Sequence, residues 1–401
     1  MEGDFIYINK WLLPLSWLYG LAIKLRNMMF DIGLLKSRSF RVPVIAVGNI
    51  TVGGTGKTPH VEFLVRLLRE QFRVAVLSRG YKRKSRGFVK ADADTGMPKI
   101  GDEPYQMKQK FPDVTVAVDK NRCHGIDMLT EEDEALDVVL LDDAFQHRYV
   151  KPGINILLVD YHRLIIYDEL LPAGRLREPL KGKDRADIVI VTKCPTDMKP
   201  MEYRVITKAM QLYPYQRLYF TALEYDELRP LFPEGPEPSE PKTSKSHGSS
   251  KSLSALADQH VLLLTGIGSP KQMDQDLSPL TASLSPMVFS DHHQFRKKDI
   301  RLINETFAAM TAPKCIVTTE KDATRLQTVH GLSDEVRRAL YVLPVRIIFL
   351  HEQEELFNQQ IIDYVRKNSR NSILAKGKDD HKPDNGYHFR DRSRTISFRD
   401  N

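Results

Sequence analysis

Residues 48–59 read Gly48-Asn49-Ile50-Thr51-Val52-Gly53-Gly54-Thr55-Gly56-Lys57-Thr58-Pro59, and they lie between an apolar run and a helical stretch, Pro59–Glu70. A strand, a glycine-rich loop and a helix in this order, with Gly-Lys-Thr at the loop's end, are typical of a phosphate-binding loop. Its backbone N–H groups face phosphate oxygens, Lys57 is expected to reach the β- and γ-phosphates, and Thr58 is a candidate Mg²⁺ ligand. Thr51 replaces the first glycine of the strict pattern, so the loop is a variant. Its candidate nucleotide-binding residues are Gly53, Gly54, Thr55, Gly56, Lys57 and Thr58.

Short runs of Val, Ile and Leu alternate with helical stretches around this loop. The runs are almost continuously apolar, as expected of parallel strands that are buried on both faces. The pattern predicts an α/β fold like that of P-loop NTPases, with a doubly wound, mostly parallel sheet. The expected strands are Val42–Val47, Arg73–Leu77, Val114–Val118, Asp137–Leu141, Ile154–Val159 and Asp187–Thr192.

One of these strands ends in two acids, Asp142 and Asp143. A phosphate-binding loop needs a carboxylate at the end of another strand to order the Mg²⁺ shell. Asp142 is therefore the metal-site candidate. Asp143 is expected to project from the opposite side of the chain, towards the substrate, as a catalytic group. The alternative is a strand-ending turn with solvated aspartates.

The rest of the chain divides by composition. Residues 232–254 are rich in Pro, Ser and Lys and cannot bury a core, whereas apolar runs resume at Val261–Thr265, Cys315–Thr319 and Leu340–Val345. The expected segments are an N-terminal interfacial helix (1–40), the phosphate-binding-loop domain (41–230), a flexible linker or loop (231–256), a smaller C-terminal α/β lobe (257–366) and a disordered basic tail (367–401).

Both tryptophans lie in an apolar run, Trp11–Ile23, near the N-terminus. This run is too short for a spanning helix, which needs about 20 residues. Lys24 and Arg26 follow it, where a signal peptide would have small residues. The mixture of apolar and basic residues predicts an amphipathic helix that lies in the headgroup layer of an anionic membrane. The alternative is a helix that covers the protein's own core.

The overall composition sets further limits. The 401 residues include 59 Lys and Arg against 52 Asp and Glu, which leaves a net charge of +7. This excess suits an anionic ligand or surface, but it is too diffuse to indicate nucleic-acid binding. The three cysteines lie far apart without a Cys-x-x-Cys pair, which argues against a zinc ribbon or a disulfide scaffold and favours a reducing cytoplasm.

Three classes of P-loop protein fit these observations: a kinase, a GTPase switch or metallochaperone, and a membrane-associated ATPase of the partitioning type. Guanine selectivity normally uses an Asn/Thr-Lys-x-Asp loop, but here Thr192-Lys193-Cys194 is followed by Pro195. In Thr319-Glu320-Lys321-Asp322 the Lys and Asp are adjacent, which is the wrong spacing. ATP is therefore preferred, and only a kinase gives the many polar motifs a role.

Those motifs occur in one order along the chain: Ser78–Arg83, Gly101–Pro104, Asp142–Arg148, Leu171–Pro179, Thr265–Gly268, Asp291–His293 and Thr319–Asp322. With the loop at 48–59 they resemble the tetraacyldisaccharide 4'-kinases, the lipid A 4'-kinase family, from about residue 11 to the mid-340s. Ala144 stands where the family pattern has glycine.

The resemblance implies an enzyme that transfers the γ-phosphate of ATP, with Mg²⁺, to the 4'-hydroxyl of a tetraacylated glucosamine disaccharide 1-phosphate. It also implies that the enzyme acts at the cytoplasmic face of the bacterial inner membrane. The implied partners are the lipid disaccharide and the anionic membrane surface, with no obligate protein partner.

The resemblance also implies site residues. It pairs Asp102 with His292, rather than His293, as the dyad that handles the acceptor proton, and this pair joins Lys57 and Asp143 among the catalytic candidates. A carboxylate can orient an imidazole, whose ordinary pKa lies near neutrality. The alternatives are that Asp102 caps a helix and that either histidine lies at the surface.

Basic and polar side chains that follow strand ends are the candidates for the substrate headgroup and sugar. The loop after the second expected strand carries most of the positive charge, and its alternative interpretation is a solvated basic loop. Residues 320–322 are expected to shape the nucleotide side. The substrate-binding candidates are Arg79, Tyr81, Lys82, Arg83, Arg122, Gln146, His147 and Arg148.

Overall fold

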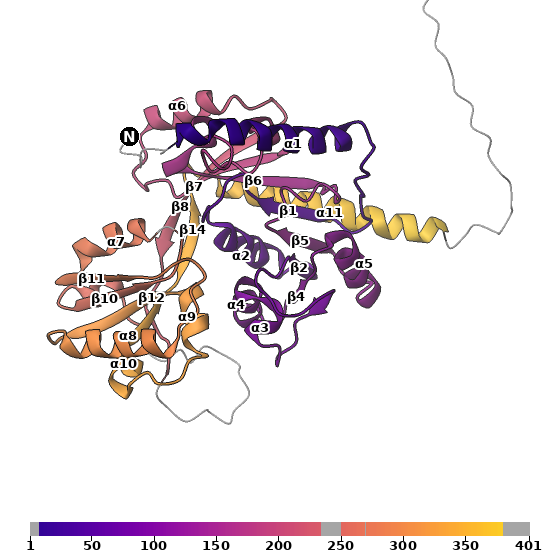
Figure 1. Ribbon diagram of the computed structural model, residues 1–401. Helices are drawn as coiled ribbons and strands as arrows, with labels where there is room; N and C mark the ends of the chain where they lie inside the picture. Colours follow the sequence, from indigo (N-terminus) through magenta and orange to yellow (C-terminus); the bar gives the residue numbers. More distant parts are fainter. Residues whose placement is uncertain (1–7, 234–249, 269, 380–401) are drawn as a thin grey trace, which may run out of the picture.

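The computed structural model describes residues 8–233, 250–268 and 270–379, which form two α/β lobes (Figure 1). The larger lobe is built on nine strands in the order β14-β8-β7-β6-β1-β5-β2-β4-β3. Neighbouring strands are parallel except the edge pairs β14–β8 and β3–β4. The predicted doubly wound, mostly parallel sheet is confirmed. The strands are β1 (Val44–Gly48), β2 (Val74–Ser78), β3 (Val89–Lys90), β4 (Thr115–Val118), β5 (Val138–Asp142), β6 (Ile154–Asp160), β7 (Ile188–Thr192), β8 (Arg217–Tyr225) and β14 (Val345–Phe349).

Helices cover both faces of this sheet, because alternate residues of its buried strands point to opposite sides. In β1, Ile45 packs into the core beneath α2 and α11, and Ala46 packs into the core beneath α5. The helices of the larger lobe are α1 (Leu13–Asp31), α2 (Lys57–Leu68), α3 (Met97–Ile100), α4 (Asp102–Lys110), α5 (Arg122–Glu132), α6 (Pro200–Met210) and α11 (Glu354–Asp379).

The smaller lobe has a sheet of five strands in the order β11-β10-β12-β13-β9, all parallel except the pair β13–β9. Its strands are β9 (Arg229–Pro230), β10 (His260–Thr265), β11 (Ser283–Val288), β12 (Lys314–Thr319) and β13 (Leu340–Leu343). Its helices are α7 (Lys271–Leu277), α8 (Lys297–Ala309), α9 (Glu320–Leu326) and α10 (Asp334–Ala339). Short 3-10 helices lie at Lys10–Leu12, Tyr161–Arg163, Ile165–Tyr167, Leu180–Arg185, Leu253–Leu256 and Ser278–Leu280.

The chain crosses between the lobes twice, and the two crossings lie side by side. Tyr225 at the end of β8 pairs with Val345 at the start of β14, and Asp226 N donates to Pro344 O at 3.0 Å. After the second crossing the chain stays in the larger lobe, where Phe357 and Ile361 of α11 join the core. Residues 345–366, which were expected in the smaller lobe, therefore belong to the larger one.

The other expected boundaries also shift. Leu231 is buried in the core of the smaller lobe, so the expected linker begins inside that lobe, and its residues 234–249 lie outside the described residues. Helix α11 continues to Asp379, so residues 367–379 of the expected tail are helical. The remainder of the tail, 380–401, lies outside the described residues.

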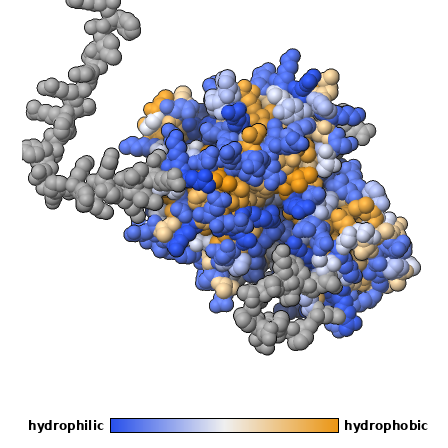
Figure 2. Space-filling view, turned by 180° about the vertical axis from the view of Figure 1, so that it is seen from behind, coloured by the Kyte–Doolittle hydropathy of each residue, from blue (hydrophilic) through white to orange (hydrophobic). Residues whose placement is uncertain are grey.

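Helix α1 lies on the outside of the larger lobe (Figure 1) and is fixed there by polar contacts. Ser16 Oγ donates to Leu170 O at 3.0 Å, and Tyr19 Oη donates to Arg177 O at 2.8 Å. Seen from behind, the molecule is mostly hydrophilic with apolar patches between (Figure 2). Among the described residues, none of the helices combines the length and the apolar character needed to cross a membrane.

Candidate active site

The loop after β1 is held in shape by its neighbours. Asn49 Nδ2 donates to Thr55 Oγ1 at 2.9 Å, and Thr192 Oγ1 donates to Thr55 O at 3.0 Å. Gly56 has φ +77°, a left-handed conformation that favours glycine, directly before α2 begins at Lys57. The loop therefore presents the N-terminus of α2 to the end of the sheet, which is the geometry that binds phosphate.

His60, which sequence reasoning missed, anchors the last turn of this loop. Its Nδ1 lies 2.7 Å from Gly56 O and its Nε2 lies 3.0 Å from Thr221 Oγ1 of β8. Burial lowers the pKa of His60 to about 4, so the ring is neutral at physiological pH. The imidazole thus ties the loop to the sheet without adding charge to the site.

Two acids at the end of β5 lie beside the loop. Lys57 Nζ is 3.6 Å from Asp143 Oδ1, and Arg177 Nη1 is 3.7 Å from Asp143 Oδ2. Asp142 is buried, and its Oδ1 has no hydrogen-bond partner. Burial, followed by the charges of Glu103 and Asp143, raises the pKa of Asp142 to about 7. A buried carboxylate oxygen without a donor is suited to a cation.

The donor set agrees with Mg²⁺. No group of three His, Cys, Asp or Glu side chains that could hold a metal occurs among the described residues. Mg²⁺ is usually held by one or two carboxylates together with water and substrate phosphates, so it does not need such a group. Asp142 and the hydroxyl of Thr58 are the residues that fit this role.

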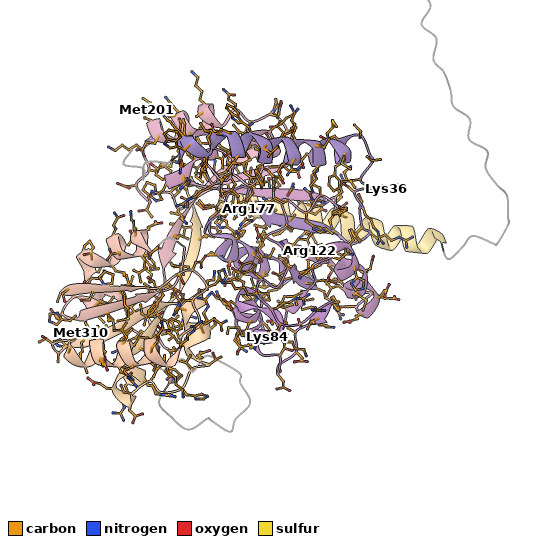
Figure 3. All side chains as sticks on the ribbon, viewed as in Figure 1. Lys36, Lys84, Arg122, Arg177, Met201 and Met310 are labelled. Atoms are coloured by element: carbon orange, nitrogen blue, oxygen red, sulfur yellow. The ribbon has the colours of Figure 1, made fainter. Side chains whose placement is uncertain are left out.

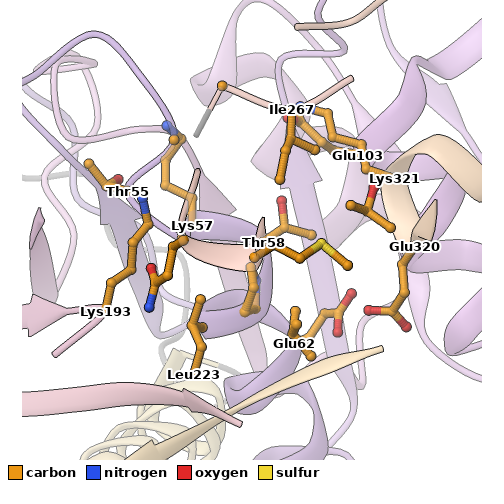
Figure 4. Close-up of a pocket in the computed structure, with 18 of the residues that line it drawn as sticks. Thr55, Lys57, Thr58, Glu62, Glu103, Lys193, Leu223, Ile267, Glu320 and Lys321 are labelled. Carbon is orange, nitrogen blue, oxygen red and sulfur yellow. The ribbon is translucent and has the colours of Figure 1, made fainter. Parts of the chain in front are cut away.

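A cavity separates the two lobes next to the loop (Figure 4). Thr55, Lys57 and Thr58 line it from the larger lobe, and Glu320 and Lys321 line it from the smaller lobe. The motif 265–268 also reaches it, since a Cβ on the glycine at 268 would lie 3.6 Å from the backbone nitrogen of the glycine at 54. The phosphate-binding loop therefore faces a cleft that both lobes close.

Asp102 and His292 meet between the lobes, next to Glu103 and Asp291, which line this cleft. Asp102 is the first residue of α4, and its Oδ2 lies 3.1 Å from His292 Nδ1. Asp102 does not cap the helix, because the N-cap residue is Gly101. His293 turns away, with its Nε2 3.0 Å from Asp299 Oδ2 and its ring stacked on Phe289. The structure brings together the pair that the resemblance implies.

The protonation of this pair follows from its neighbours. Burial alone raises the pKa of Asp102, but hydrogen bonds and charge from His292 and Arg325 outweigh it and lower the pKa to about 2. Lys321 Nζ lies 3.2 Å from His292 Nε2, and an ammonium can only donate. Nε2 is therefore the acceptor, and Nδ1 carries the proton that Asp102 accepts.

Comparison with known proteins decides the family. The model of the tetraacyldisaccharide-1-P 4'-kinase family matches residues 8–366. The chain belongs to this family. The tetraacyldisaccharide 4'-kinase of Phocaeicola vulgatus is 58% identical over 380 residues, 94% of this chain and 100% of that protein. The one of Bacteroides thetaiotaomicron is 53% identical over 383 residues, 95% of this chain and 100% of that protein.

A solved structure of the family agrees. The crystal structure of the "apo" form of LpxK from Aquifex aeolicus in complex with ATP is 30% identical and has a TM-score of 0.64. The match covers 88% of this chain and 98% of that one. The resemblance to the tetraacyldisaccharide 4'-kinases that the motifs indicated is thereby confirmed.

Four of the substrate candidates lie near the acids and the dyad. Arg122 is buried, and burial lowers its pKa to about 10, which leaves it cationic at neutral pH. Burial and the charges of Arg122, Arg26 and Arg79 lower the pKa of His147 to about 4. The ring of Tyr81 lies 5.2 Å from that of His292. Arg122 and Arg177 both lie within the larger lobe (Figure 3).

The other candidates have structural contacts. Arg83 donates to the carbonyls of Val118 and Gly87, and Gln146 donates to the carbonyl of Asn49. Arg148 donates to Asn27 O at 2.9 Å and pairs with Asp31 at 2.6 Å, which fixes the end of α1. Lys82 Nζ lies 5.6 Å from the centre of the Tyr81 ring. These contacts hold loops and the end of α1 in place, and the role of the four residues in substrate binding stays a prediction.

Proposed function

We propose that this chain transfers the γ-phosphate of ATP to the 4'-hydroxyl of a tetraacylated glucosamine disaccharide 1-phosphate, a reaction of lipid A biosynthesis. The observation that carries the proposal is that the phosphate-binding loop lines a cleft between the lobes, and that Glu103 and Asp291, the chain neighbours of the paired Asp102 and His292, line the same cleft. Membership of the tetraacyldisaccharide-1-P 4'-kinase family supports the choice of substrate.

The larger lobe binds the nucleotide. The loop's backbone N–H groups and the N-terminus of α2 hold the phosphates, and Lys57 neutralises charge on the oxygens of the transferred group. Mg²⁺ held by Thr58 and Asp142 would supply further positive charge to the phosphates. Asp143 holds Lys57 beside the loop, and Arg177 shares that carboxylate.

The Asp102–His292 dyad acts on the 4'-hydroxyl that accepts the phosphate. His292 Nε2 removes the proton of the 4'-hydroxyl while its oxygen bonds to the γ-phosphorus, and the bond from that phosphorus to the β-phosphate oxygen breaks, which leaves ADP. Asp102 accepts the Nδ1 proton in a hydrogen bond and stabilises the imidazolium that forms. Arg79 and Arg122, with Tyr81 and His147, bind the phosphorylated sugar.

The test is an assay of radiolabelled γ-phosphate transfer with purified full-length protein. We expect label in the lipid when the disaccharide 1-phosphate is supplied, and no transfer to an analogue that lacks the 4'-hydroxyl. Label released only as inorganic phosphate, at one rate with or without lipid, would contradict the proposal and favour an ATPase without a small substrate.

The same proposal includes the membrane, because the substrate is a lipid. Helix α1 exposes Trp17, Leu18 and Leu21, and Trp11 directly before it is 93% exposed. Large apolar side chains at this exposure are costly in water, whereas tryptophan is favourable at a bilayer interface. We infer that α1 lies on the anionic cytoplasmic leaflet of the inner membrane.

Replacing Trp11 and Trp17 together with glutamate should lower binding to vesicles that contain phosphatidylglycerol by about 10-fold or more. The reason is that both side chains are exposed and have few contacts to lose in the free protein. Vesicle sedimentation measures the effect. Leu302→Glu combined with Leu356→Glu, at exposed sites on α8 and α11, is the control with the same two added charges and should bind like the parent. Equal loss in the control would show that charge alone is responsible.

A further inference from the structure

Arg325 joins the two lobes at the dyad. It is buried on α9 of the smaller lobe and reaches across to Asp102 of the larger lobe. Its Nε and Nη2 donate to Asp102 Oδ2 at 2.9 and 2.6 Å, and its Nη1 donates to Asp322 Oδ1 at 2.9 Å. A buried guanidinium is stable only when its donors are paired, and here two carboxylates pair it.

The contact with Asp322 fixes Arg325 from within the smaller lobe. Asp322 is fully buried, and its Oδ2 accepts hydrogen bonds from Gly266 N at 2.8 Å and Thr319 Oγ1 at 2.7 Å. Asp322 lies one helical turn before Arg325, on the same face of α9. The contact with Asp322 therefore fixes the position of the Arg325 guanidinium independently of Asp102.

Through its contact with Asp102, Arg325 is connected to His292, the proposed base. Asp102 Oδ2, which Arg325 holds, is also the oxygen that accepts the Nδ1 proton of His292. Arg325 Nη2 lies 3.3 Å from His292 Nδ1. The direction of the carboxylate decides which way the ring faces, so a chain of contacts runs from Asp322 through Arg325 and Asp102 to His292.

We propose that Arg325 is a positioning residue for phosphoryl transfer, which fixes the Asp102 carboxylate so that Nε2 of His292 faces the acceptor hydroxyl. The inference rests on the proposed function, in which His292 is the base. Arg325 acts through Asp102, and its two-pronged donor geometry matters as well as its charge.

The charged groups around the His292 imidazole predict that the pH dependence of kcat changes when Arg325 is removed. His292 faces Asp102 from α4, Lys321 and Arg325 from α9, Asp291 from its own loop, and Tyr81 from the loop after β2. Removal of Arg325 leaves the charge of Asp102 unbalanced beside the ring, which favours the protonated, inactive imidazole. The acid limb of the kcat profile then moves to higher pH. Lysine at position 325 keeps the positive charge but lacks the two N–H donors that Arg325 directs at Asp102.

The experiment compares Arg325→Ala and Arg325→Lys in the full-length enzyme with ATP and the lipid disaccharide. Both variants should lower kcat by about 10- to 100-fold, the usual effect of losing a group that orients a reacting side chain. The KM for ATP should stay within about twofold, because the nucleotide contacts are intact. The acid limb should move up in Arg325→Ala and stay in Arg325→Lys, and added guanidinium should restore part of the alanine variant's activity.

The control is Arg185→Ala, which breaks the ion pair at 2.7 Å between the partly exposed Arg185 and the buried Glu178 elsewhere in the larger lobe and should leave the pH profile unchanged. An unshifted profile in Arg325→Ala would overturn the inference, as would the absence of rescue by guanidinium. Should the alanine variant fail to fold, wild-type kcat in Arg325→Lys would overturn it.

A readout without turnover separates this inference from the proposed function. The parent's lipid phosphorylation tests the function, whereas an NMR titration of the His292 ring, assigned with His292→Gln, tests the effect of Arg325. An unchanged titration in Arg325→Ala would overturn the inference whether or not the parent transfers phosphate.

Discussion

Lys57→Met is expected to reduce the rate of phosphate transfer to the lipid disaccharide by about 1000-fold, within the range that one transition-state cation contributes in phosphoryl transfer. Methionine has nearly the length of lysine but no charge, so the phosphate-binding loop keeps its shape and only the neutralisation of the γ-phosphate oxygens is lost. Asp143 also loses one of its two cationic neighbours, and Arg177 remains. Initial rates with radiolabelled ATP measure the effect.

Lys90→Met is the matched control for this variant. Lys90 pairs with Glu132 at 3.0 Å on the surface of the larger lobe, and its removal should leave turnover unchanged. Circular dichroism and thermal unfolding should show that both variants are folded. Near-normal turnover in Lys57→Met would contradict the assignment of the phosphate-binding loop.

His292→Ala is expected to lower kcat by more than about 100-fold, the range that general acid–base catalysis supplies. The variant removes the acceptor nitrogen Nε2 and leaves Asp102 paired with Arg325, so the contact between the lobes persists. The KM for ATP should change little, because the phosphate-binding loop is not altered. Steady-state kinetics at saturating lipid measure kcat and KM separately.

His293→Ala tests the choice between the neighbouring histidines. His293 contacts Asp299 and stacks on Phe289 within the smaller lobe, so its loss should lower thermal stability and leave kcat within about threefold. Full activity in His292→Ala together with a large loss in His293→Ala would reverse the assignment.

The parts of the fold that could be predicted from sequence are those specified by local pattern. The apolar runs, the loop at 48–59 and the acids after β5 each signal their structure within about ten residues, so strand identity and the phosphate-binding site follow from the sequence. The contact of Asp102 with His292 joins residues 190 positions apart. It was expected only because the motifs resemble a known family.

The parts that could not be predicted depend on long-range assembly. An apolar run such as Val345–Phe349 reads the same whether it joins one sheet or the other, and only its pairing with β8 places it in the larger lobe. Arg325 carries no motif that distinguishes it from a surface arginine on α9. The available signal in the sequence was the three-residue spacing between Asp322 and Arg325. That spacing indicates a role for Arg325 only once the fold places Asp102 opposite it.

The paired crossings between the lobes have a mechanical consequence. Since Tyr225 and Val345 are neighbours in one ladder, the smaller lobe is an insertion into a hairpin of the larger lobe. The chain of the smaller lobe therefore leaves and re-enters the larger lobe at one place, through two paired strands. His292 and Arg325 are carried by the inserted lobe and Asp102 by the larger lobe. The pair that handles the acceptor proton is thus divided between the two lobes, and its geometry depends on how the inserted lobe is seated on the larger one.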